Sequence, residues 1–285
     1  MNNTKIAFRT VAASFLAAVT LSAPAAADAA PLPVPSDSPI LVLGASYAEG
    51  KLPLDDMLQG PFGGSSVGFG SYMDLGDALS RQGMFVVNEA QAGATATDRT
   101  MCLDTFCLSV GWLGYSAQLS KALARVAIPD PTDPATVVAY NAQYVYFGIV
   151  NDCMHSGAAG IPQLDSSPCG EAEVDAFVDE VIEAATEAMD VGLVPIFPKY
   201  PDYDDIDLSI QAGATGLTWY ANEAQWNLLA DRWRERIAED LPDAIVVDAW
   251  ANMNTLPDGL HPTPRSAKKA AKRIIRAIDE YEAGA

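Results

Sequence analysis

The sequence of 285 residues is poor in basic side chains and holds only two histidines and four cysteines. Its 17 lysines and arginines stand against 37 aspartates and glutamates, a formal net charge of −20. A surface of this charge repels nucleic acid phosphates and anionic membranes, so we expect neither nucleic acid binding nor stable membrane association. The hydrophobic content of 49% is enough for a sizeable core in one α/β domain.

Long apolar runs are also missing. The stretch 11–21 is too short to span a bilayer comfortably, but it follows a basic start and precedes the small residues 25–27. This pattern predicts a signal peptide, residues 1–27, with cleavage after Ala30 or an uncleaved anchor as alternatives. We therefore expect a secreted or periplasmic protein.

The even number of cysteines in an exported chain predicts disulfides, for which three pairings are possible. Proximity in sequence favours Cys102–Cys107 and Cys153–Cys169. Free buried thiols are the alternative. No Cys-x-x-Cys pair is present, so we expect no structural metal site.

After an extended lead-in, residues 28–38, short apolar runs alternate with helical patterns through one domain, residues 39–285. This alternation predicts a parallel sheet covered by helices on both faces. Ligands of such sheets bind beyond the carboxyl ends of the strands. The predicted strands are 39–44, 85–87, 144–150, 193–197 and 244–247, and the predicted helices are 70–82, 111–126, 171–191, 220–239 and 264–281.

Chemically useful residues follow three of these strands. Ser46 lies in a Gly-Ala-Ser turn that can expose its hydroxyl, although a serine there can also simply cap a helix. Gly93 permits close approach of a backbone N–H to a ligand, or is an ordinary turn glycine. Asn151 can direct its amide at a developing oxyanion, or form an Asx turn.

The most specific signal is Asp258-Gly-Leu-His261, just before the last predicted helix. An aspartate and a histidine three residues apart on one loop can pair. The carboxylate then holds the imidazole in the tautomer that accepts a proton from serine.

Together these segments resemble the SGNH (GDSL-like) hydrolase superfamily. The resemblance implies a three-layer α/β/α sandwich with a flavodoxin-like five-stranded sheet. It also implies carboxylic ester hydrolysis without metal or cofactor. Ser46 would be the nucleophile, with Asp258 and His261 completing the triad. The N–H groups of Ser46 and Gly93 and the side-chain amide of Asn151 would form the oxyanion hole.

Two departures from the family pattern matter. Ala45 replaces the aspartate of Gly-Asp-Ser. The third conserved block of the family reads Gly-x-Asn-Asp. Here Gly148 lies three residues before Asn151 instead of two, and Ile149 takes the place expected for the glycine. The second departure predicts a different course of the backbone that leads to Asn151.

Weaker signals surround these. His155 also has an aspartate three residues before it, but its place between two cysteines favours a loop histidine. The loop 199–207 mixes aromatic and acidic residues and is interpreted as a solvated loop, with sugar binding or calcium binding as alternatives. Core packing is the commoner role for the remaining aromatics considered, Trp112, Tyr115, Trp219 and Trp226.

The expected substrates are short-chain acyl or acetyl esters, possibly on carbohydrate. A lysophospholipase or lipase for longer chains is the nearest alternative, with Leu52, Leu54, Met57 and Leu58 able to line an acyl pocket. A non-catalytic carbohydrate-binding protein on the same fold is another. An FMN protein is the most distant alternative, because the first loop lacks the hydroxyl residues of a phosphate site.

Overall fold

The computed structural model describes residues 38–49, 73–103, 106–149, 151–154, 169–209 and 222–284, and for 99–111 the backbone alone. All of them belong to one compact unit, Val34–Ala285. The predicted signal peptide lies outside the described residues, as do His155, Trp219, Leu52, Leu54, Met57 and Leu58. Among the described residues, no helix is both long and apolar enough to cross a membrane.

Within the described residues, five parallel strands form the central sheet, in the order β2-β1-β7-β8-β9. The central strands carry continuous apolar sequences because helices cover both of their faces, and all four residues of β1 are fully buried. The predicted flavodoxin-like sheet is thereby confirmed. Its strands are β1 (Ile40–Leu43), β2 (Val86–Asn88), β7 (Tyr144–Phe147), β8 (Val194–Pro198) and β9 (Ile245–Val247).

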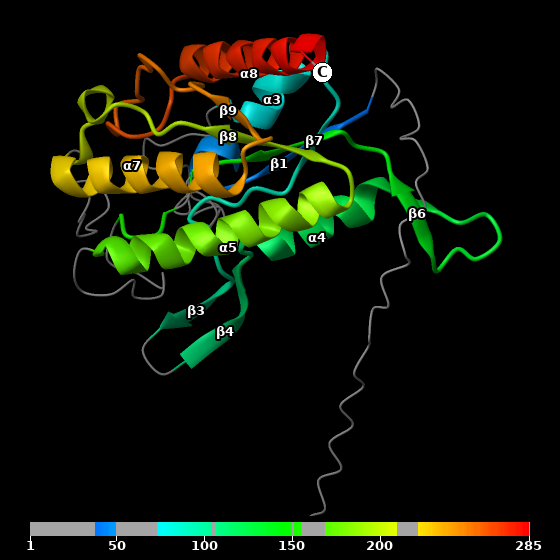
Figure 1. Cartoon of the computed structure of the whole chain (residues 1–285). Coiled ribbons are helices and arrows are strands. Elements are labelled where there is room, and N and C mark those ends of the chain that lie inside the picture. Colours follow the sequence, from blue (N-terminus) through cyan, green and yellow to red (C-terminus); the bar gives the residue numbers. More distant parts are fainter. Residues whose placement is uncertain are drawn as a thin grey trace, which may run out of the picture. The chain divides into compact units, whose positions relative to one another are not determined.

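Helices pack on both faces of this sheet and complete the predicted three-layer sandwich (Figure 1). On one face lie α3 (Leu75–Ser80) and α8 (Pro264–Gly284). On the other lie α4 (Tyr115–Val126), α5 (Glu171–Asp190) and α7 (Glu223–Asp240). Each long helix turns an apolar stripe inward. The stripe of α5 consists of Val174, Phe177, Val178, Val181, Ala184, Ala185 and Ala188.

The helix predicted over 111–126 begins later in the structure, at Tyr115. Residues up to Trp112 belong to strand β4 (Phe106–Trp112), which pairs antiparallel with β3 (Arg99–Leu103). The helix begins only after Gly114, whose backbone is extended and whose N–H is taken by the Asp98 carboxylate at 2.7 Å. Pairing of β4 with β3 therefore overrides the helical pattern at 111–112.

A second hairpin was not predicted either. It joins β5 (Ala127–Pro129) to β6 (Val137–Tyr140) directly after α4. Its strands are too short to show a periodic pattern. The same holds for the 3₁₀ turn η1 (Tyr203–Asp205).

Candidate active site

Ser46 is the first residue of a short helix, α1 (Ser46–Glu49), and it follows β1 after only two residues. Gly44, which precedes the turn, has a φ of +139°, and a Cβ built on it would lie 3.0 Å from the Cα of Gly148. The side chain of Gln118 bonds both backbone polar groups of Gly44, at 2.8 and 3.2 Å. The turn that presents Ser46 is thus held from α4 and from β7.

The loop between β9 and α8 delivers the Asp-x-x-His pair to this turn. The Nε2 atom of His261 lies 2.9 Å from the Oγ atom of Ser46, and its Nδ1 atom lies 2.7 Å from Oδ2 of Asp258. The other carboxylate oxygen of Asp258 accepts from the N–H groups of Leu260 and His261, both at 2.9 Å. The structure therefore brings together three residues that the sequence separates by up to 215 positions.

Burial by itself would raise the pKa of Asp258, but the hydrogen bonds from His261 and from the backbone N–H of Leu260 outweigh it and lower the pKa below its usual range. An ionised Asp258 can only accept, so Nδ1 of His261 carries the proton. This tautomer leaves the lone pair of Nε2 toward the Ser46 hydroxyl. The arrangement suits removal of the hydroxyl proton.

Gly93 and Asn151 come together at a shared neighbour, Ala94. The Ala94 carbonyl accepts from the Asn151 side-chain amide at 3.0 Å and from its backbone N–H at 3.3 Å. An amide NH₂ has two N–H donors, and this bond uses one of them. Gly93 itself has a φ of +84°.

The displaced glycine of the third block has a packing explanation. Gly148 lies against Gly44, its N–H donates to Leu43 at 2.9 Å, and its carbonyl accepts from the Tyr115 hydroxyl at 2.7 Å. A Cβ on Gly148 would meet the Leu43 carbonyl at 3.1 Å. The glycine thus permits the close approach of the two parallel strand ends. Asn151, one residue further on than in the family pattern, still reaches the Gly93 segment.

The sequence matches the profile of the GDSL-like lipase/acylhydrolase family over residues 40–274. The chain belongs to this family. It is accordingly a carboxylic ester hydrolase. A comparison with curated proteins finds no match.

Solved structures of similar fold come from several bacteria. A carbohydrate acetylesterase from Sinorhizobium meliloti shares 14% identity, with 85% of this chain and 99% of that chain covered and a TM-score of 0.51. A lipolytic protein of the G-D-S-L family from Desulfitobacterium hafniense shares 13% identity, with 84% of this chain and 99% of that chain covered and a TM-score of 0.46. An acetylxylan esterase from Geobacillus stearothermophilus shares 15% identity, with 85% of this chain and 94% of that chain covered and a TM-score of 0.45.

In this GDSL-like hydrolase, Ala45 replaces the aspartate of the motif, but Glu49 supplies a carboxylate near the nucleophile turn. Glu49 lies one helical turn after Ala45 and accepts a hydrogen bond from the N–H of Ala92. The carbonyl of Ala92 accepts from the indole N–H of Trp112 at 2.7 Å. Both backbone polar groups of Ala92, the residue before Gly93, are therefore hydrogen-bonded. Glu49 was not singled out from the sequence, although its spacing from Ala45 is the signal that would have found it.

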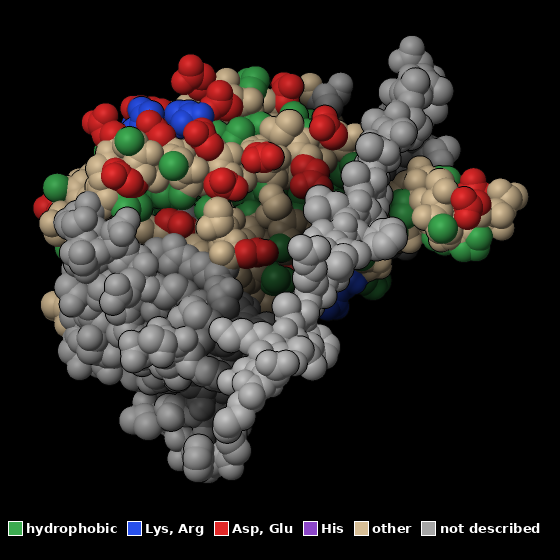
Figure 2. All heavy atoms as spheres, turned by 90° about the horizontal axis from the view of Figure 1, so that it is seen from below, with side chains coloured by type: hydrophobic (Ala, Val, Ile, Leu, Met, Phe, Trp, Pro, Cys, Tyr) green, Lys and Arg blue, Asp and Glu red, His purple; other side chains and the backbone are tan. Residues whose placement is uncertain are grey.

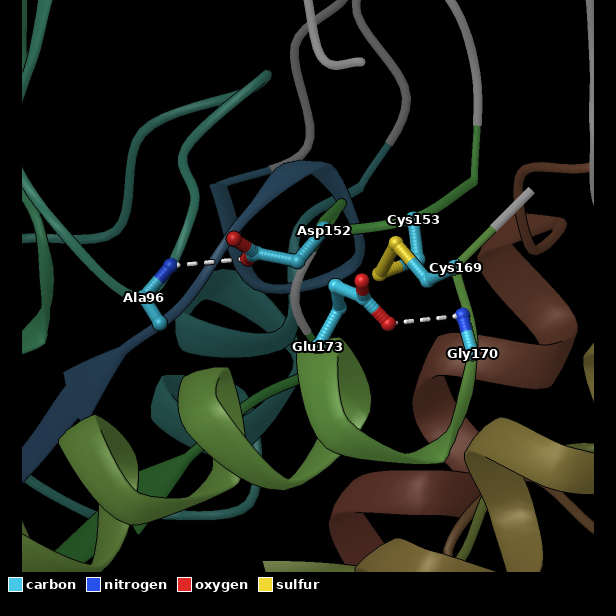
Figure 3. Close-up of a disulfide and its surroundings, with 6 residues drawn as sticks. All are labelled: Ala96, Asp152, Cys153, Cys169, Gly170 and Glu173. Atoms are coloured by element: carbon cyan, nitrogen blue, oxygen red, sulfur yellow. Dashed lines mark hydrogen bonds between the residues drawn. A yellow bond between two sulfur atoms is a disulfide. The ribbon is translucent and has the colours of Figure 1, made fainter. Parts of the chain in front are cut away.

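A disulfide joins Cys153 to Cys169, with a Cα–Cα distance of 5.4 Å (Figure 3). It fastens the segment after Asn151 to the residue that precedes Gly170, the N-cap of α5. Beside it, the Asp152 carboxylate accepts from the N–H of Ala96 at 2.8 Å, which ties the same segment to the Gly93 loop.

The other predicted disulfide would join strands β3 and β4. Cys102 and Cys107 stand opposite each other in the β3–β4 ladder. Their side chains lie outside the described residues, so Cys102–Cys107 stays a prediction.

The loop 199–207 packs against the loop that carries Asp258 rather than forming a plain solvated segment. The Tyr200 ring is buried edge-on to Trp226, with ring centroids 5.5 Å apart. The Asp205 carboxylate accepts from the N–H of Met253 at 3.2 Å. Tyr115 and Trp226 are core residues, as expected. In the part of the chain that the structure describes, no acidic, His or Cys side chains cluster as a metal site would require.

Proposed function

We propose that the protein hydrolyses short carboxylic esters through an acyl-enzyme formed on Ser46. His261 is the general base and Asp258 holds its imidazole. The observation that carries this proposal is the unbroken series of hydrogen bonds from the Ser46 hydroxyl through His261 to Asp258, at 2.9 and 2.7 Å. All three residues are at most 6% exposed, so these bonds act in a poorly solvated environment.

In the first half-reaction, Nε2 of His261 takes the Ser46 proton while Oγ bonds to the acyl carbon. The bond from that carbon to the alcohol oxygen then breaks, and the alcohol leaves with the proton from His261. In the second, His261 takes a proton from water. The resulting hydroxide displaces Ser46 as the acid forms, and the proton returns to Ser46.

An oxyanion forms in each half-reaction and needs hydrogen-bond donors. We assign them to the N–H groups of Ser46 and Gly93 and to the second N–H of the Asn151 side chain. Loss of one such donor typically raises the barrier by about 3 kcal/mol. The bond from Asn151 to the Ala94 carbonyl supports this assignment, because it restrains the amide beside Gly93.

For the substrate we propose a small, water-soluble ester, with acetyl groups on carbohydrate as the first class to examine. The net charge of −20 disfavours approach to anionic lipid surfaces. Figure 2 shows Asp and Glu side chains spread over the described part of the face that α5 and α7 cover.

We also propose that the enzyme acts outside the cytoplasm. The basic and apolar N-terminal pattern supports export, and the bridge between Cys153 and Cys169 suits an oxidising compartment. N-terminal sequencing of protein recovered from periplasm or medium tests this. A mature N-terminus at Asp28 is expected, and an intact Met1 would contradict it.

The chemistry is tested by a fluorophosphonate probe on wild type and Ser46→Ala. Labelling of wild type alone is expected, and labelling that persists in Ser46→Ala would reject the nucleophile. The substrate class is tested by kcat/KM on acetyl, butyryl, octanoyl and palmitoyl esters at matched solubility. A maximum at acetyl or butyryl is expected. A maximum at octanoyl or longer would favour the lipase alternative.

A further inference from the structure

The residue after the proposed nucleophile makes a bond that none of the functions assigned above uses. The Tyr47 hydroxyl donates to the carbonyl of Leu260 at 2.8 Å, across 213 positions of sequence. Leu260 directly precedes His261. One side chain therefore connects the turn that carries Ser46 to the loop that carries its hydrogen-bond partner.

The Tyr47 ring also contacts two rings of that loop, those of Trp250 and His261. Its centroid is 5.3 Å from that of Trp250, at an interplanar angle of 73°, and 6.1 Å from that of His261, at 64°. Burial raises the pKa of Tyr47 well above its usual value, and the nearby Asp258 raises it further. The hydroxyl consequently remains a donor at every pH at which an ester hydrolase is assayed.

The Leu260 carbonyl and the His261 N–H belong to one peptide group. That N–H donates to Oδ1 of Asp258 at 2.9 Å. Donation from Tyr47 polarises this peptide group and strengthens its N–H as a donor, because hydrogen bonds in series reinforce one another. A series thus runs from Tyr47 through one peptide group to the carboxylate that holds the imidazole.

We propose that Tyr47 is a positioning residue of the reaction, which sets the placement of His261 against Ser46 and the hydrogen bonding of Asp258. This rests on the function proposed above. The family takes its name from Gly-Asp-Ser-Leu, and Tyr47 stands where that sequence has leucine. Leucine fills space there but donates nothing, so the hydroxyl is a feature of this chain beyond the motif.

The test removes the hydroxyl and keeps the ring. Tyr47→Phe should lower kcat on a short ester by roughly fivefold to tenfold, the effect of one hydrogen bond, with KM within about twofold of wild type. The matched control is Tyr144→Phe. Tyr144, at the start of β7 and away from the site, is also buried and donates a 2.8 Å bond, to Glu282. The kcat of this control should be that of wild type.

A second readout separates positioning from mere stability. The proton on Nδ1 of His261, bonded to Asp258, should give a low-field NMR resonance. With only two histidines in the chain, its loss in His261→Ala assigns it. Tyr47→Phe should displace or broaden this resonance, whereas Tyr144→Phe should not. Replacement of Tyr47 by 3-fluorotyrosine, a stronger donor of the same shape, should move it in the opposite direction.

The outcomes are separable. A wild type that the fluorophosphonate does not label defeats the proposed function itself. A labelled wild type, with Tyr47→Phe unchanged in kcat and in the His261 resonance, overturns the role of Tyr47. A Tyr47→Phe variant that differs from wild type only in its melting temperature overturns it as well. In a His261→Ala background, Tyr47→Phe should have no further effect on the residual rate, and an undiminished effect there would contradict action through His261.

Discussion

The N–H of Asp207 donates a 2.6 Å hydrogen bond to the carbonyl of Gly259 and so joins the loop after β8 to the loop that carries Asp258 and His261. Gly259 has a φ of +77°, and a Cβ on it would lie 2.3 Å from the Asp207 carbonyl oxygen. No flexible side chain stands there to move aside, so both backbones would have to shift. The placement of the proposed base therefore depends on a glycine that is not itself part of the chemistry.

We predict that Gly259→Ala lowers both the stability and the rate. The matched control is Gly192→Ala, because Gly192 has a φ of +86° but a Cβ on it would meet nothing within 4 Å. The control should carry only the left-handed backbone cost of about 1–2 kcal/mol. Gly259→Ala should lose more free energy of unfolding in urea, and its kcat should fall at least tenfold. Equal losses in the two variants would show that contact with Asp207 is unimportant.

The lowered pKa of Asp258 gives a prediction about acid. A carboxyl whose pKa is lower in the folded than in the unfolded protein stabilises the fold above its unfolded pKa of about 3.9. That contribution is lost as pH falls through the folded value. As the pH falls below about 4, the free energy of unfolding should therefore fall less steeply in Asp258→Asn than in wild type. Parallel curves would contradict this.

At neutral pH the Asp258→Asn variant should also lose roughly 10³- to 10⁴-fold in kcat, because asparagine favours the wrong imidazole tautomer.

Glu49 should act on the oxyanion side of the site. Its carboxylate accepts from the N–H of Ala92, the residue before Gly93. Glu49→Ala should lower kcat by roughly tenfold, the effect of one charge-assisted hydrogen bond, and Glu49→Gln should recover part of it. Asp130→Ala is the control, since that carboxylate also accepts from a backbone N–H, at 2.7 Å from Thr132, but in the β5–β6 turn. If both alanine variants kept wild-type kcat, the Glu49 bond would have no role in the reaction.

Removal of the bridge between Cys153 and Cys169 should affect stability and rate together. The double replacement by serine frees a loop that the bridge closes over a separation of 16 residues, which should lower the free energy of unfolding by about 3 kcal/mol. Because Asn151 lies two residues before Cys153, kcat should also fall. Reductant should weaken wild type in the same way and should weaken the double variant less. A reductant effect of equal size in the double variant would assign it to other cysteines.

Much of the scaffold follows from local sequence. Buried parallel strands need apolar residues on both faces, so β1 and β7 are visible as apolar runs, and the stripe of α5 repeats at helical spacing. The pairing of Asp258 with His261 is equally local, since three residues on one turn bring the carboxylate to the ring. These features depend on neighbours along the chain, and the sequence alone predicts them.

Tertiary structure decided the rest, because the contacts concerned join residues that sequence proximity does not relate. β3 and β4 exist through their pairing, which ends the helical pattern at Trp112. Gly148 is placed by its close approach to Gly44, more than a hundred residues earlier. The bonds of Tyr47 to Leu260 and of Glu49 to Ala92 likewise form only once β1, β2 and β9 end at the same edge of the sheet. The residue types for the chemistry can be read from local patterns, whereas the contacts that orient them arise from the packing of distant strand ends.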